Sequence, residues 1–264
     1  MAVLAHKFND PELDRTLQLF LRITAGLFRD RLISVVLQGS LVFNDLAPGY
    51  GDLDFLAVID GDLASDDLRD LVEIRKPLRR GDHGILALML EGPFLPRHTL
   101  NPACLGRAFC WGTSGERPWE KNNLGALALS VIREKGIVIR GEDIRREIPV
   151  PAYAEMLGQV RDFCESAVKH GQPGRLHSID WLLTAARLLL WLKEGRLSSK
   201  SEAADWGALH ARGAWRECLP RARQLRLNPS AAASHHWKQW LDGLETPIRQ
   251  AVEELQQELA AEGT

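Results

Sequence analysis

Two apolar segments joined by a turn-rich connection constrain the fold of this chain more than any other feature. They run from Ile33 to Leu37 and from Leu53 to Ile59, and the connection is rich in Gly, Pro and Asn. Short apolar runs with many β-branched residues, bounded by such turn residues, are typical of buried strands. We therefore expect these segments to be two strands of a sheet.

Polar residues stand at both ends of this connection. Gly39 and Ser40 follow the first segment, and Asp52 and Asp54 open the second. Because side chains alternate along a strand, both aspartates point to the same side. Mg²⁺ commonly takes one or two protein carboxylates together with phosphate oxygens and water, and the missing Cβ of Gly39 lets backbone N–H groups approach phosphates. An Asp-x-Asp pair alone is more often a solvated strand edge, but the combination predicts a site for a Mg²⁺–nucleoside triphosphate.

The composition narrows the class of protein. The chain has 264 residues, 45% of them hydrophobic, which suffices for one large domain or two smaller ones. A net charge of −2 gives no general attraction to nucleic acid or to an anionic membrane, so we expect a small-molecule substrate. The four scattered cysteines lack Cys-x-x-Cys spacing, and we see neither a signal peptide nor an apolar run of ~18 residues. We expect a cytoplasmic monomer with reduced thiols and no membrane contact.

The first part of the chain alternates helical and strand patterns. After a helix that Asp10 caps, we expect the two strands above and then the following elements: a helix that Ser65 caps and that ends before Pro77, a third strand over Gly84–Leu90, an irregular segment over Pro93–Glu120, a helix over Lys121–Lys135 and a short strand over Ile137–Ile139.

The second part of the chain reads as helical throughout. Two prolines at 149 and 151 mark the boundary, and the expected helices cover residues 152–170, 176–194, 199–211, 214–225 and 231 to the end. These patterns predict an α+β chain with two domains, residues 1–148 and 149–264. A substrate cleft is expected between the domains.

A second group of polar residues lies in the helical part. Asp180, Thr184, Arg187 and Trp191 follow steps of 4, 3 and 4, so they share one face of a helix that is otherwise mostly Leu and Ala. Ser199–Glu202 is a capping box that starts the next helix and places Lys200 in its first turn. A lysine there opposes the helix dipole unless an anion lies close by, and a bound triphosphate would supply one. In the alternative interpretation, Arg187 pairs with an acid such as Asp180 and Lys200 is solvated.

Several of these motifs resemble known families. Gly39-Ser40 followed by Asp52-x-Asp54 resembles the signature of the nucleotidyltransferase superfamily with the DNA polymerase β-like fold. Leu182–Arg187 and Gly195–Trp206 resemble the C-terminal domain of the streptomycin/spectinomycin adenylyltransferases, in which a Thr-x-x-Arg helix leads to a Lys-x-x-Ala-Ala-Asp-Trp stretch. The resemblance runs from about Leu32 to Trp206 and includes Leu124–Gly141.

The resemblance implies an N-terminal nucleotidyltransferase domain, built on a small mixed sheet with helices, and a helical domain that clamps substrate and ATP. It implies transfer of AMP from ATP to a hydroxyl of a small molecule, an aminoglycoside-type antibiotic among the candidates. Asp52 and Asp54 would hold Mg²⁺ and carry catalysis. The ATP phosphates would be bound by four residues: Gly39, Ser40, Arg187 and Lys200.

The sequence departs from the family on the acceptor side. The family has a third carboxylate, a base, at the start of the strand before a Pro-Trp loop. If that strand is Gly84–Leu90, the aligned position falls near Ile85; of the nearby acids Asp82 and Glu91, we favour Glu91 because it could face the same strand edge as the aspartates. The family tryptophan is replaced by Arg97, and positions that contact the drug read His177 and Asp180. The resemblance thus supports ATP as donor but not streptomycin as acceptor.

Two other functions remain open on the sequence. The chain could modify a protein or a tRNA, as toxin–antitoxin members of the superfamily do. It could also be a nucleotide-binding homologue with weakened catalysis, because the third acid is not identified. We expect the segment from Pro93 to Trp119 to select the acceptor.

Overall fold

A computed structural model describes residues 4–112 and 115–262 of the chain. The chain divides into two compact units, Met1–Pro151 and Ala152–Thr264. The first unit combines a mixed sheet with helices and the second is helical, so the predicted α+β class is confirmed.

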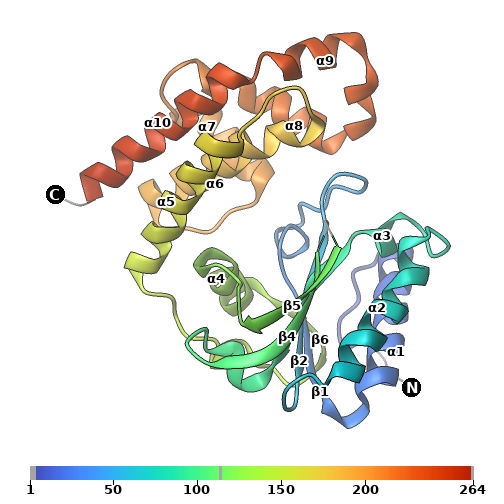
Figure 1. Ribbon diagram of the computed structural model, residues 1–264. Coiled ribbons are helices and arrows are strands. Elements are labelled where there is room, and N and C mark those ends of the chain that lie inside the picture. Colours follow the sequence, from blue (N-terminus) through green and yellow to red (C-terminus); the bar gives the residue numbers. More distant parts are fainter. Residues whose placement is uncertain (1–3, 113–114, 263–264) are drawn as a thin grey trace. The chain divides into compact units, whose positions relative to one another are not determined.

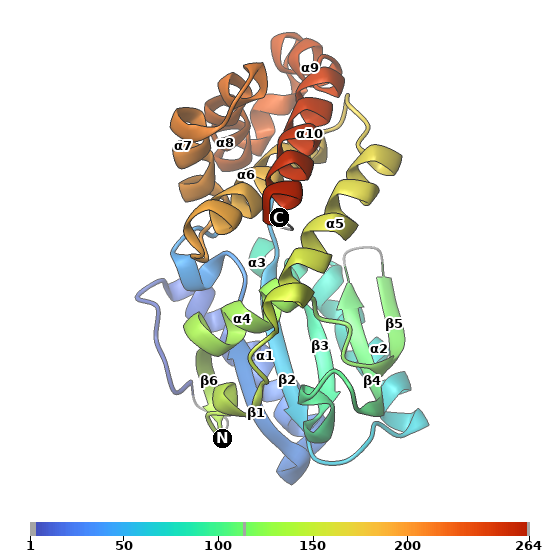
Figure 2. The same ribbon diagram turned by 90° about the vertical axis from the view of Figure 1, so that its left-hand side faces the viewer.

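The first unit is built on a six-stranded sheet in the order β5-β4-β3-β2-β1-β6 (Figure 2). Strands β2 and β3 are parallel, and every other neighbouring pair is antiparallel. The strands have these bounds: β1 Leu32–Leu37, β2 Leu53–Ile59, β3 Leu90–Pro96, β4 Leu105–Gly112, β5 Gly115–Lys121 and β6 Ile137–Gly141. The two strands predicted first, β1 and β2, lie side by side between β3 and β6.

Helices cover both faces of the sheet (Figure 1). Helices α1 (Pro11–Phe28) and α2 (Ser65–Arg79) lie on one face, and α4 (Ala126–Lys135) lies on the other. The first face carries a core that includes Phe55 and Ala57, and the opposite face a core that includes Leu56 and Val58. Because both faces of β2 are covered, the strand is a continuous apolar run, as is typical of a strand buried on both sides.

The prediction of a strand over Gly84–Leu90 is wrong. The short helix α3 (Ile85–Leu88) takes most of that segment, and β3 begins only at Leu90. The parallel pairing of β2 with β3 skips two positions, because Asp54 pairs with Glu91 and the next pair is Ala57 with Phe94. Gly92 and Pro93 occupy the gap. Proline has no N–H to donate to the ladder, and a Cβ on residue 92 would lie 2.0 Å from the Phe55 carbonyl oxygen, so residue 92 must be glycine.

Other boundaries in the first unit also differ from the predictions. The segment Pro93–Glu120 is not irregular, since it contains the end of β3 and the β4–β5 hairpin. Pro118 is tolerated because β5 is an edge strand. Helix α2 runs past Pro77 to Arg79, and its N-cap is Ala64 rather than Ser65. Helix α4 begins at Ala126, because β5 continues to Lys121.

The second unit contains helices at each of the predicted places. Their bounds are α5 Tyr153–His170, α6 Ile179–Glu194, α7 Lys200–His210, α8 Leu219–Leu227, α9 His235–Asp242 and α10 Glu245–Glu262. The single helix expected from Ala231 to the end is wrong, because the chain breaks at Gly243 between α9 and α10. No helix in the described part of the chain is both long and apolar enough to cross a membrane.

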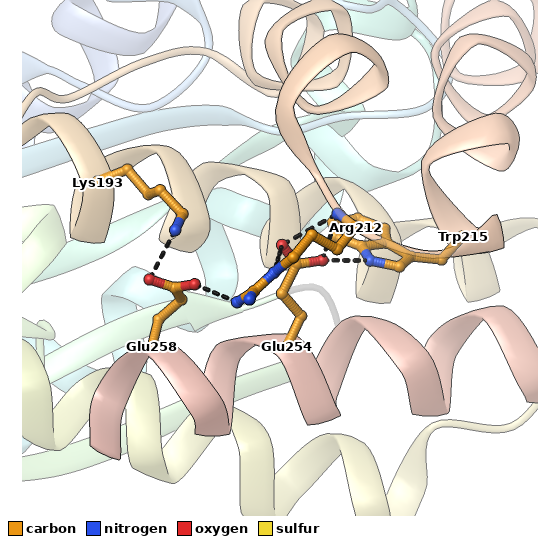
Figure 3. Close-up of polar contacts among 5 residues, drawn as sticks. All are labelled: Lys193, Arg212, Trp215, Glu254 and Glu258. Atoms are coloured by element: carbon orange, nitrogen blue, oxygen red, sulfur yellow. Dashed lines mark hydrogen bonds and ion pairs between the residues drawn. The ribbon is translucent and has the colours of Figure 1, made fainter. Parts of the chain in front are cut away.

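A buried carboxylate ties the helices of the second unit together (Figure 3). Glu254 of α10 is 4% exposed and accepts hydrogen bonds from Trp215 Nε1 at 2.9 Å and from the Arg212 backbone N–H at 2.8 Å. One turn later, Glu258 pairs with Lys193 of α6 at 2.6 Å and with the Arg212 guanidinium. These contacts join α10 to α6 and to the segment before α8.

Candidate active site

The turn after β1 requires glycine at its first bend. Gln38 N–H donates to the Asp54 carbonyl at 3.0 Å, which brings the turn against the start of β2. Gly39 then adopts a φ of +65°, and a Cβ at this position would lie 1.9 Å from Asp54 Oδ2. The Asp54 carboxylate therefore occupies the space that any other side chain at residue 39 would need. Gly39 and Asp54, predicted as parts of one site, are in direct proximity.

Ser40 presents a buried hydroxyl beside the same turn. It precedes the 3₁₀ turn Leu41–Phe43, and its carbonyl accepts from Asp45 N–H at 3.0 Å. Its Oγ is shielded from solvent and finds no hydrogen-bond partner within residues 4–112 and 115–262. Buried polar atoms without a partner are rare in folded proteins, and many of them receive a hydrogen bond once a ligand or a water molecule binds.

Asp52 and Asp54 lie at the start of β2 on one face of the sheet. Both are half-buried, whereas Leu53 and Phe55 between and after them are fully buried. Strand alternation places the two aspartates on the face of Leu56, which belongs to the core beneath α4. The two carboxylates thus lie on the same face as that core, closer to the start of β2.

Glu91 lies on the same face in the neighbouring strand. It is the second residue of β3, half-buried, and it is the register partner of Asp54 in the parallel pairing. Leu95, four residues on, packs in the core beneath α4, so Glu91 shares the face of the aspartates. The other candidate positions do not reach this edge through a strand: Ile85 opens helix α3 with 45% of its surface exposed, and Asp82 lies in the exposed turn before it.

The charged groups near this face affect the pKa of the Cys110 thiol. Its register partner is Pro93 on β3, which shares the face of Glu91. Burial raises the pKa of the Cys110 thiol to about 11, Arg117 and Arg75 act to lower it, and Glu91 and Asp54 raise it further. The thiol therefore lies within electrostatic reach of both carboxylates. The four cysteines all lie in the described part of the chain and form no disulfide.

The donor set fits a Mg²⁺ ion that is shared with phosphates rather than one caged by protein alone. Across the described ranges, no group of three or more His, Cys, Asp or Glu side chains is arranged to hold a metal ion. Mg²⁺ needs only one or two carboxylates when substrate phosphates and water complete its octahedron. Asp52 and Asp54 could supply those oxygens, and the missing side chain of Gly39 leaves room for the Asp54 carboxylate beside the turn. These two aspartates are the residues that would hold the ion.

In the second unit, Arg187 and Lys200 lie on successive helices. Arg187 Nε donates to the Ser198 carbonyl at 3.0 Å, which holds the half-buried side chain against the α6–α7 connection. Lys200 opens α7, and its Nζ is 2.5 Å from Asp180 Oδ1. The other Asp180 oxygen is 3.1 Å from His177 Nδ1. The anion near Lys200 is thus Asp180, whereas the sequence leaves a choice between bound triphosphate and solvent.

The capping box predicted for α7 forms only in part. Ser199 Oγ accepts from Glu202 N–H at 3.0 Å, as predicted. The Glu202 carboxylate instead pairs with Arg196, which lies in the connection before the helix.

The sequence patterns did not identify Arg75, a buried arginine with hydrogen bonds to β3, β4 and β5. It lies on α2 between Leu71 and Leu78, in steps of 4 and 3, so it occupies a core-facing position of an amphipathic helix. An arginine at such a position is the signal that could have identified it, because a charged side chain is almost never buried without partners.

Comparisons with known proteins find one matching family model and a similar solved structure. Residues 152–255 match the model of a family described as the aminoglycoside adenylyltransferase C-terminal domain. The structure is similar to the crystal structure of spectinomycin adenyltransferase AAD(9) from an Enterococcus species, solved with ATP and spectinomycin. The TM-score is 0.68 at 18% sequence identity, and the similarity covers 93% of this chain and 98% of that one. No curated protein sequence matches the chain. The predicted resemblance to these adenylyltransferases is confirmed.

Proposed function

We propose that the protein is an adenylyltransferase that moves AMP from ATP to a hydroxyl group of a small antibiotic of the aminoglycoside type. The observation that carries this proposal is the register pairing of Asp54 with Glu91 beside the glycine turn at Gly39. Two carboxylates for a metal, a third carboxylate on the next strand and a glycine turn beside them are the parts that such a transfer needs. The shared fold with an adenyltransferase solved with ATP supports the choice of donor.

Each residue has a role in this proposal. Asp52 and Asp54 hold Mg²⁺, which when bound neutralises phosphate charge at the reacting phosphorus. Glu91 accepts the proton of the acceptor hydroxyl as that oxygen attacks. The N–H groups of the Gly39-Ser40 turn donate to phosphate oxygens of ATP, and the Ser40 hydroxyl gains the partner that it lacks among the described residues.

Arg187 and Lys200 are proposed to bind the phosphates of ATP from the helical unit. The matched motif of the adenylyltransferase C-terminal domain supports this assignment, as does the charge of both groups. Lys200 would exchange the Asp180 carboxylate for a phosphate when ATP binds. The stronger charge of a triphosphate favours that exchange.

The position of Glu91 bears on the two alternative functions. A homologue with weakened catalysis was suggested because the third acid was not identified, and the register pairing of Glu91 with Asp54 supports an active enzyme instead. Modification of a protein or a tRNA remains the second candidate because the site chemistry is the same. The net charge of −2 favours a small acceptor over a nucleic acid.

The proposal is tested by a pyrophosphate-release screen with Mg²⁺ and ATP across spectinomycin, streptomycin and other aminoglycosides, paired with a resistance test in cells. We expect release that depends on one or a few of these acceptors. Label from α-labelled ATP on macromolecules in a cell extract would favour the second candidate. ATP binding without pyrophosphate release on any acceptor would contradict transferase activity.

A further inference from the structure

Arg75 is a buried cation on the face of the sheet opposite the carboxylates. Its side chain is 3% exposed, and its helix, α2, packs over the core that contains Phe55 and Trp111. The guanidinium carbon lies 5.4 Å from the centre of the Trp111 ring. Because burying an unpaired charge is costly, such an arginine is retained only where its donors are well satisfied.

The guanidinium group of Arg75 joins three strands at the end of the sheet where the carboxylates lie. Its Nη2 donates to the Leu90 carbonyl of β3 at 3.3 Å and to the Gly112 carbonyl of β4 at 3.2 Å. Its Nη1 is 3.0 Å from Glu116 Oε1 on β5. Burial and then the charge of Arg79 lower the pKa of Arg75, whereas Glu116 and Glu91 raise it. The Glu91 carboxylate is therefore within electrostatic reach of this cation.

The contact with Leu90 acts directly on the next residue. The Leu90 carbonyl belongs to the peptide group whose nitrogen is that of Glu91, so a hydrogen bond to this oxygen fixes the plane from which the Glu91 side chain departs. Glu91 pairs with Asp54 of β2, whereas the pairs of β3 with β4 begin only at Gly92, where the pairing with β2 is interrupted. The register thus holds Glu91 through β2 alone, and the hydrogen bond from Arg75 to the Leu90 carbonyl is a further restraint.

We propose that Arg75 is a positioning residue that holds Glu91 in place for the transfer reaction, an inference that rests on the function proposed above. The hydrogen bonds of Arg75 named above go to β3, β4 and β5, whereas Asp52 and Asp54 lie at the start of β2. Loss of Arg75 should therefore reduce the rate of the chemical step more than the binding of ATP. Small displacements of a catalytic group cost about 10²-fold in rate per ångström.

The test compares kcat and KM for ATP in purified full-length variants. We expect Arg75→Met and Arg75→Lys to lower kcat by roughly 10- to 100-fold with KM for ATP changed less than about threefold. Lysine keeps the charge but lacks the planar fork that serves all three strands. Glu116→Gln keeps Arg75 and leaves no cavity, so it tests the same network if Arg75→Met does not fold; we expect kcat to fall in it as well, by a smaller factor.

Arg31→Met is the matched control. Arg31 donates to the carbonyls of Asp60 and Asp62 and pairs with Asp67 at 2.9 Å, at the opposite end of β2 from Asp52. It should lower stability without lowering kcat. An unchanged kcat in Arg75→Lys and Glu116→Gln would overturn this inference but not the proposed function. An equal loss of kcat in Arg31→Met would do the same. A wild-type protein without any turnover would overturn the proposed function and the inference with it.

Discussion

At the scale of single residues, Gly39 is required by the turn after β1 and also belongs to the proposed site. Its positive φ and the nearby Asp54 carboxylate both exclude a side chain. We predict that Gly39→Ala loses turnover, because the new methyl group must displace the Asp54 carboxylate from the place where the metal would bind. The backbone strain alone should cost about 1–2 kcal/mol of stability.

Gly61→Ala separates the two effects of that substitution. Gly61 has a φ of +71°, and a methyl group added there would have no described atom within 4 Å, so this variant carries the strain without the clash. In urea unfolding both variants should be destabilised, Gly39→Ala by at least as much as Gly61→Ala, and in a pyrophosphate-release assay only Gly39→Ala should lose turnover. Equal turnover in the two variants would contradict the assignment of this turn to the site.

The local motifs could be predicted from sequence, whereas the third acid depended on a strand boundary. Gly39 and Asp54 are brought together by two consecutive strands and the turn between them, so a short sequence pattern carries the whole arrangement. Glu91 reaches the same face through the parallel pairing of β2 with β3, a contact that no local pattern encodes. The sequence favours Glu91 among the nearby acids, yet it predicts the start of the strand six residues too early.

At the scale of elements, β3 shows why the strand boundary was missed. The run Ile85–Leu90 is apolar, and short apolar runs do not distinguish a strand from a turn of buried helix. The true strand contains Gly92 and Pro93, which sequence rules treat as strand breakers. Tertiary context reverses that preference, because the ladder to β2 is interrupted at these two residues.

Helix α10 offers a stability prediction in the second unit. Glu254 accepts from both the Arg212 N–H and the Trp215 indole, and both donors would keep only part of their bonding if the carboxylate became an amide. We expect Glu254→Gln to lower the free energy of unfolding by about 1–3 kcal/mol. The neighbouring Glu253 is exposed, so Glu253→Gln should change stability little in the same denaturant titration. Equal effects of both substitutions would show that the buried network contributes nothing.

The segment after β6 predicts a pH effect. Hydrogen bonding from Arg145 lowers the pKa of Asp143 to about 2 from 3.8. A carboxyl group with a depressed folded-state pKa stabilises the fold above its unfolded value, and that contribution disappears as pH falls toward the folded value. The free energy of unfolding of the wild type should exceed that of Asp143→Asn, and this difference should shrink as pH falls from 3.8 to about 2. The difference will be small because the Asp143 side chain is 52% exposed. A difference that grows as pH falls would contradict the lowered pKa of Asp143.

At the scale of the whole molecule, the proposed function gives the helical unit a part in binding the nucleotide. We predict that Lys200→Ala weakens ATP binding in calorimetry, because a cation that would contact phosphate is removed. Lys193→Ala is the control, since Lys193 also forms a lysine–carboxylate pair in the same unit, with Glu258 at 2.6 Å. An ATP affinity unchanged in Lys200→Ala, or lowered equally in Lys193→Ala, would leave Lys200 as a structural partner of Asp180.

The α+β class and the resemblance to the adenylyltransferases could be predicted from the sequence, because both depend on short, local patterns. The surroundings of the residues expected to contact the acceptor could not be predicted from the sequence: the segment expected to be an irregular loop contains the β4–β5 hairpin, and Asp180 contacts both His177 and Lys200. A polar cluster of this kind depends on rotamers and register rather than on spacing.

Transfer of AMP can be followed through the fate of α-labelled ATP incubated with the protein, Mg²⁺ and spectinomycin or another aminoglycoside. We predict that the label moves to the small molecule with release of unlabelled pyrophosphate. We also predict that Asp54→Asn stops this transfer while the variant stays folded, and that Asp60→Asn, an exposed aspartate at the far end of β2, does not. Full transfer by Asp54→Asn, or label that stays on ATP with every acceptor in the wild type, would contradict the proposed function.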